Sequence, residues 1–119
     1  MSHSITLEAA AAMTRRYRAN REAVLLPAHQ GKNLLPLSET FDRAAIDSVL
    51  AQPSCVALRI YYGMDEELKL HAIVVAADKD NADILPVAKT DDDDDDEGIA
   101  ENANRCPPLC PPSSPLNEP

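Results

Sequence analysis

The first fifty residues carry apolar positions at helical spacing. The hydroxyl of Thr6 can accept hydrogen bonds from free N–H groups, which predicts a helix beginning there. Four apolar residues then recur at spacings of three, four and seven: Ala10, Met13, Tyr17 and Val24. These spacings place them on one stripe of the predicted helix.

A second helix is predicted between Thr40, which can cap it, and Pro53, which ends it. Ile46, Val49 and Leu50 form its apolar face, with Ala45 beside them. We expect this face to cover a sheet. The segment before it, residues 25–37, carries Pro27 and Pro36, and because proline disfavours helix in the preceding residue we expect an ordered loop.

From Cys55 onward apolar residues recur at every second position, which is the spacing of a strand. CVALRIYYG places Val56, Leu58, Ile60 and Tyr62 on one strand face, while LKLHAIVVAA from Leu68 becomes apolar on both faces. Apolar residues on both faces are typical of a central strand.

DILPV from Asp83 predicts a short third strand, at an edge because Pro86 lacks an N–H. The pattern therefore predicts an α+β fold: two helices packed on a small antiparallel β-meander of about three strands, forming one compact domain over residues 1–88.

Charge separates the rest of the chain from this domain. The net charge is −9, but the run DDDDDDE at residues 91–97 supplies seven of the 20 acidic residues, and the others nearly balance the 11 basic ones. We expect an acidic low-complexity linker over residues 89–104 and a Cys/Pro-rich tail over residues 105–119.

The same balance argues against nucleic-acid binding, which favours a net positive surface. Four arginines between residues 15 and 21 are therefore interpreted as a solvated helix face. The sequence shows no export signal and no window of the ~20 apolar residues that a membrane-spanning helix needs. We expect a cytoplasmic protein without a membrane partner, in which Cys55, Cys106 and Cys110 are thiols.

Two stretches, QPSCVALRIYYGMDEELKLHAIVV and NRCPPLCPPSSPLN, resemble a group of small bacterial proteins of uncharacterised activity. That group combines a "PGC…RIYYG" strand with a late "CPPYC" motif before a terminus that contains proline. The likeness covers about residues 43–76 and 105–117, and it departs from the pattern at Ser54, Leu109 and Pro111. The resemblance implies that the cysteine-containing ending is a regular part of the protein and not an accidental tail. It implies no activity.

Cys106 and Cys110 allow three kinds of site. An extended polyproline segment would set their Cα atoms roughly 12 Å apart, whereas a disulfide needs no more than about 7 Å. A local bridge would therefore require a turn at Pro108 and Leu109, or a cis proline. Zinc binding would need Cys55 and a histidine as further ligands, because a closely spaced second cysteine pair is missing from the sequence. Thiol-redox chemistry usually has two residues between the cysteines at the start of a helix, which proline opposes here.

No catalytic constellation or cofactor motif is recognisable in the sequence. The turn DKDNAD from Asp78 lacks the glycine and the final glutamate of a calcium-binding loop. The acidic run 91–97 could bind divalent cations without a defined geometry, and solvated charge is the simpler interpretation of it.

The sequence therefore predicts a non-enzymatic protein-interaction or self-assembly module without a cofactor. Prolines reduce the conformational entropy that the tail loses when it docks. We expect it to dock on its own domain or on a neighbouring subunit, which would build a homo-oligomer or filament. The contact residues predicted for the tail are Cys106, Pro107, Pro108, Leu109, Cys110 and Leu116. The alternatives are a thiol-redox or zinc site at Cys106 and Cys110, and cation binding by residues 91–97.

Overall fold

The structure, a computed structural model, describes residues 3–86, 99–101 and 103–118. It divides into two compact units. The first unit combines residues 1–38 with residues 105–119, and the second unit comprises residues 39–104. The predicted tail thus belongs to the same unit as the N-terminal helix. Neither helix in the described part of the chain has the length and apolar character needed to cross a bilayer.

The first unit is built on helix α1 (Leu7–Asn20). As predicted, Thr6 caps it, and its hydroxyl oxygen accepts a hydrogen bond of 3.0 Å from the N–H of Ala9. The expected apolar stripe is not the buried face, because Ala11 is the buried residue of the helix while Met13 is exposed. The segment that follows contains a short 3₁₀ turn, η1 (Pro27–His29), and the buried residue Leu34.

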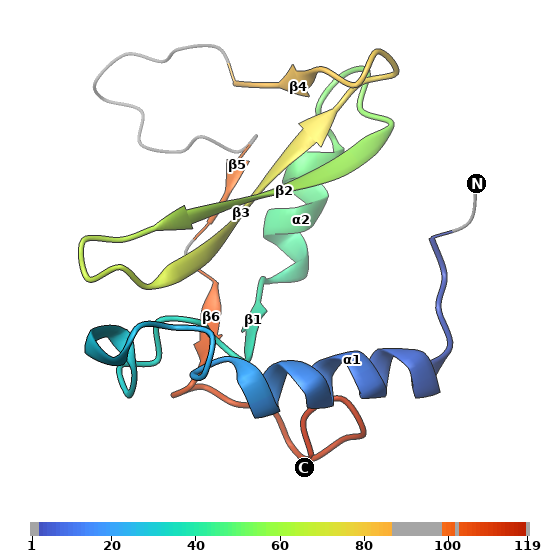
Figure 1. The fold of residues 1–119 in the computed structure, drawn as a ribbon. Helices are drawn as coiled ribbons and strands as arrows, with labels where there is room; N and C mark the ends of the chain where they lie inside the picture. Colours follow the sequence, from blue (N-terminus) through green and yellow to red (C-terminus); the bar gives the residue numbers. More distant parts are fainter. Residues whose placement is uncertain (1–2, 87–98, 102, 119) are drawn as a thin grey trace. The chain divides into compact units, whose positions relative to one another are not determined.

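The second unit pairs helix α2 (Arg43–Leu50) with a four-stranded antiparallel sheet (Figure 1). The prediction that Thr40 caps this helix is wrong. The N-cap is Asp42, and Thr40 is the last residue of strand β1 (Ser38–Thr40), which pairs with β6 (Asn104–Cys106).

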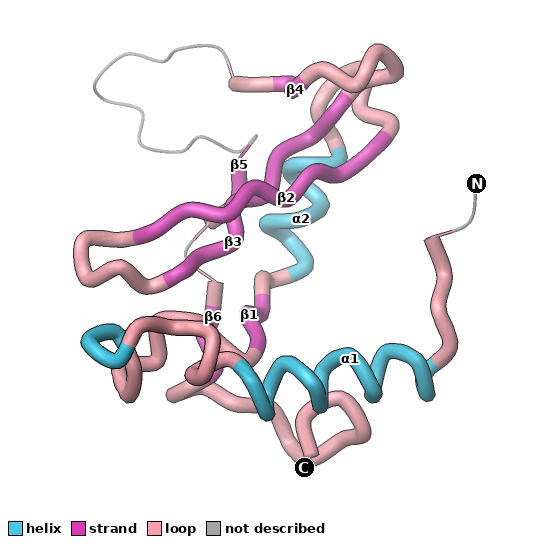
Figure 2. Tube along the Cα trace, viewed as in Figure 1, coloured by secondary structure: helices cyan, strands magenta, loops and turns pink. Residues whose placement is uncertain are grey.

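The strands of the larger sheet are β2 (Ala57–Met64), β3 (Leu70–Ala77), β4 (Asp83–Ile84) and β5 (Ile99–Ala100). Strand β3 pairs with all three others, which confirms its predicted central position, and β2 and β3 form the long hairpin visible in Figure 2. The α+β class and the antiparallel meander β2–β3–β4 are confirmed. Strand β5 was not predicted, because a two-residue strand leaves no periodicity to detect.

The core of the second unit lies between α2 and one face of this sheet. Val49 of α2, Val74 and Ala76 of β3, and Ala100 of β5 form a cluster of buried residues. Five partly buried residues pack around the cluster: Phe41, Ala45, Ile46, Cys55 and Ile84. No side chain of β2 belongs to this set, so the helix covers the central part of the sheet and leaves β2 at its border.

Replacing Val49, which has an exposed fraction of 0%, with alanine leaves a cavity that the packed core cannot close. We expect Val49→Ala to lower the free energy of unfolding by about 2 kcal/mol. Urea denaturation followed by circular dichroism measures the change. Leu50→Ala, one residue further along the same helix but exposed, is the matched control and should cost less than half as much. Equal losses for the two variants would contradict the observed orientation of the helix.

Candidate functional site

The two tail cysteines form a disulfide, with their Cα atoms 4.6 Å apart. The expectation that both are thiols is therefore wrong. The peptide bonds preceding Pro107 and Pro108 are both cis, and the N–H of Leu109 donates a hydrogen bond of 2.9 Å to the carbonyl of Arg105. The segment consequently turns back on itself and does not extend as a polyproline helix would. Neither sulfur of the bonded pair is a thiolate, which is the form that zinc requires.

Burial differs among the residues predicted as tail contacts. The exposed fraction of Cys106 is 3%, and Pro107 is half-buried. The remaining four, Pro108, Leu109, Cys110 and Leu116, are exposed. Within the first unit, hydrogen bonds connect the tail to the rest of the chain.

These bonds involve main-chain carbonyls and two arginines. The N–H of Leu37 donates to the carbonyl of Cys106 at 2.7 Å, and the guanidinium of Arg105 donates to the carbonyls of Asn33 and Leu34 at 2.6 and 2.8 Å. Arg18 of α1 donates to the carbonyl of Leu116 at 2.7 Å and also to that of Glu118. The sequence pattern does not identify Arg18 as a contact of the tail, because a solvated arginine and one that binds distant carbonyls have the same local pattern.

A second candidate surface is the face of β2 that continues the side covered by α2. Four side chains at alternate positions lie on it, with exposed fractions of 40% for Leu58, 48% for Ile60, 72% for Tyr62 and 63% for Met64. We call these four residues the β2 row. Among the described strands β2 pairs only with β3, so its outer edge has no partner there. The predicted alternation of β2 is present, but its apolar face is largely exposed and lies outside the core.

The opposite face of β2 is fixed by an ionic and hydrogen-bonded cluster. Arg59 forms an ion pair with Asp83, and its guanidinium also donates to the carbonyl of Asn81 at 3.0 Å. The hydroxyl of Tyr61 donates to the other carboxylate oxygen of Asp83 at 2.6 Å. Hydrogen bonds from Tyr61 and Arg59 lower the pKa of Asp83, and the hydrogen bond to Asp83 raises the pKa of Tyr61. These contacts connect β2 to β4 across the central strand and hold β2 in place.

His71 lies between two carboxylates at the other end of the hairpin. Its Nε2 is 2.8 Å from Asp65, and its Nδ1 is 3.5 Å from Oε2 of Glu39. The hydrogen bond with His71 lowers the pKa of Asp65. Because the carboxylates lie at opposite ring nitrogens, the three groups cannot converge on one ion. The part of the chain that the structure describes contains no three His, Cys, Asp or Glu side chains placed so that they could hold one metal ion. Residues 91–97, the predicted cation site, lie outside it.

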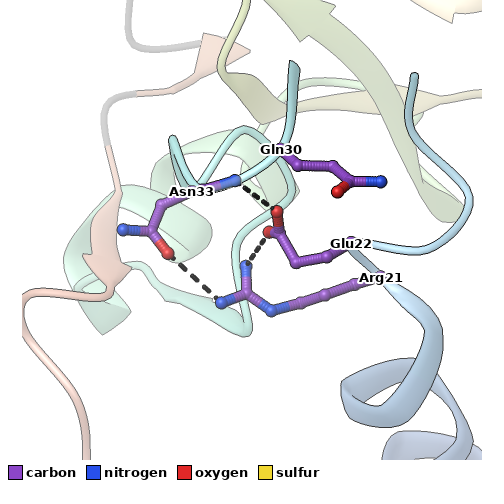
Figure 3. A pocket seen from close by; sticks show the side chains of 5 residues that line it. Arg21, Glu22, Gln30 and Asn33 are labelled. Atoms are coloured by element: carbon purple, nitrogen blue, oxygen red, sulfur yellow. Dashed lines mark hydrogen bonds and ion pairs between the residues drawn. The ribbon is translucent and has the colours of Figure 1, made fainter. Parts of the chain in front are cut away.

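A hollow in the first unit has a volume of about 540 Å³ and is lined mostly by polar residues (Figure 3). Their polar groups bind one another: Arg21 donates to Asn33 Oδ1 at 3.2 Å, and Glu22 accepts from the N–H of Gly31 at 2.6 Å. Arg21 and Glu22 are also 3.7 Å apart as an ion pair. Since these polar groups already form hydrogen bonds and an ion pair with one another, we interpret them as contacts that hold the loop in place and not as a ligand-binding site.

A stability measurement in acid tests the cluster around Asp83. Since its pKa in the folded protein lies below the ordinary value of 3.8, its stabilising effect is present above that value and is lost as the pH falls through the lower folded pKa. We expect Asp83→Asn to reduce the urea midpoint at pH 6 and to flatten its decline between pH 4 and pH 2.5. Asp80→Asn, in the adjoining turn, should keep the slope of the unmodified protein. If the urea midpoints of Asp83→Asn and of the unmodified protein declined in parallel as the pH falls, the lowered pKa of Asp83 would be contradicted.

Comparison with known proteins adds no family to this geometry. No protein-family profile matches the sequence, and no curated protein or solved structure is significantly similar to it. The candidate sites are therefore inferred from the contacts, burial and charge of the described residues.

Proposed function

We propose that this protein is a non-enzymatic protein-interaction module that accepts an extended segment of a partner along strand β2. The observation that carries the proposal is the exposed β2 row on a strand whose outer edge pairs with no described strand. An added strand binds such an edge through main-chain hydrogen bonds, and alternate side chains provide selectivity.

The composition of β2 supports this role. Edge strands are usually protected against pairing by lysine, proline, a bulge or a short length. Strand β2 has eight residues, contains neither lysine nor proline, and pairs with β3 in continuous register from Ala57 to Met64. Its one charged residue, Arg59, forms an ion pair with Asp83 in the same sheet.

The tail has a different role in this proposal. Its carbonyls accept hydrogen bonds from Arg18, and Cys106 is bonded to Leu37, all within the first unit. These contacts favour docking of the tail on its own chain. Exchange of the tail between neighbouring subunits is then a secondary route to a homo-oligomer or filament.

The proposal is tested with a nine-residue probe peptide in which valine and threonine alternate between terminal lysines. We expect the peptide to shift the backbone amide NMR signals of residues 57–64 in the ¹⁵N-labelled protein, because it adds a strand to β2. The same peptide with every amide nitrogen methylated has no main-chain N–H to donate and should leave these signals unchanged.

Ile60→Lys should weaken binding of the probe at least tenfold, since it places a charge in the β2 row. Leu109→Lys introduces the same charge at an exposed leucine of the tail and should bind the probe as the unmodified protein does. Absence of shifts in residues 57–64 of the monomeric protein at millimolar peptide, or equal shifts with the methylated peptide, would refute strand addition.

A second candidate function, thiol–disulfide exchange, is favoured by the unequal burial of the disulfide. Cys110 is exposed, whereas Cys106 is buried. A glutathione thiolate that attacks Sγ of Cys110 forms a mixed disulfide as the Cys106–Cys110 bond breaks. The electron pair remains on Sγ of Cys106, which then takes a proton from water. We propose a cytoplasmic location, where such a bond would be reversible because the compartment is reducing.

Brief incubation of a Cys55→Ala variant with limiting glutathione, followed by acid quenching and peptide mass spectrometry, tests this candidate. We expect the glutathione adduct on Cys110 at several times its level on Cys106, because only the sulfur of an exposed residue is accessible to attack. Predominant modification of Cys106, or an intact disulfide without any adduct, would argue against exchange at this site.

A further inference from the structure

We propose that the segment accepted by β2 is β2 of a second copy of this chain, paired antiparallel about a two-fold axis. This inference rests on the proposed function and specifies its partner. A two-fold interface requires a patch that is complementary to itself, and an antiparallel pair of identical strands meets that condition.

Hydrogen bonding restricts the register of such a pair. In β2, every second residue directs its N–H and C=O groups toward β3, and the residues between direct theirs to the outer edge. Outward-directed residues of one copy must face outward-directed residues of the other. Even-numbered residues therefore pair with even-numbered ones, and odd with odd. This parity puts the β2 rows of both copies on the same face of the joined sheet.

Charge and side-chain size distinguish two of the registers that this pairing allows. A two-fold axis at Arg59 would place the two guanidinium groups opposite each other, which is unfavourable. An axis at Tyr61 instead sets Arg59 opposite Gly63, whose position carries no side chain. The geometry points to this register, in which Leu58 faces Met64 and Ile60 faces Tyr62. Pairs of aromatic and β-branched side chains are among the favourable cross-strand neighbours.

The same register accounts for the exposed apolar row. Helix α2 packs on Val74, Ala76 and Ala100 and leaves the β2 row exposed beside it. When two copies join, the rows lie next to each other between the two α2 helices, on the face that already contains both cores. Apolar side chains that are exposed in one copy thus gain apolar neighbours, which is the main favourable contribution in association.

Sedimentation equilibrium of the full chain tests the proposal. We expect the mass of a dimer at micromolar concentration and a monomer for Ile60→Lys, with at least a tenfold increase in the dissociation constant. Leu109→Lys is the matched control and should remain dimeric. Circular dichroism of both variants confirms that they are folded, since Ile60 is half exposed and outside the core cluster.

A cross-link tests the register. In a Cys55→Ala background, Tyr61→Cys places two thiols opposite each other at the two-fold axis, and mild oxidation should convert most of the protein to a covalent dimer. Tyr62→Cys, whose counterpart is Ile60, should cross-link several times less efficiently. Similar efficiency for the two variants would contradict this register.

The outcomes separate this inference from the proposed function. A chain that is monomeric at every concentration but still binds the probe peptide along β2 would overturn the inference and leave strand addition standing. A dimer that Ile60→Lys does not weaken would overturn the inference as well. If the probe peptide also failed to shift residues 57–64, the proposed function would fall with it.

Discussion

Packing of Val49 against Val74 and Ala76 is the contact on which the second unit depends. Aromatic residues make up only 3% of the chain, so the core consists of small aliphatic side chains that fill space only when helix and sheet approach closely. A helix as short as α2 cannot cover the full width of the sheet. It covers β3 and β5, and the exposed row of β2 is the geometric consequence. The candidate interaction surface thus follows from the small size of the core.

The sequence predicted the features that depend on local periodicity. Helix α1 with its Thr6 cap, the central position of β3 and the α+β class all follow from such patterns. It did not predict β5, whose two residues carry no period, or the start of α2. Periodicity also identifies the apolar face of β2 without indicating whether another element covers it, because coverage depends on where a distant helix packs.

The conformation of the tail was likewise only partly predictable, because its local sequence does not determine its long-range contacts. Proline content predicted a stiff, docked segment, and its expected extension opposed a bridge between Cys106 and Cys110 unless a turn or a cis proline brought the two residues together. Two cis peptide bonds reverse that geometry, and the isomer of a prolyl bond is set by its surroundings in the fold. The hydrogen bonds from Arg18 and Arg105 to carbonyls far along the chain are equally invisible to local patterns. Non-local contacts therefore define both candidate sites.

The discontinuity of the first unit has a consequence for biosynthesis. Its two parts, residues 1–38 and 105–119, are separated by the whole of the second unit. On a ribosome, which adds roughly 5–20 residues per second, helix α1 is made before residues 39–104 and before the strand and carbonyls that complete its own unit. Helix α1 therefore acquires these partners only after all of residues 39–104 has been synthesised.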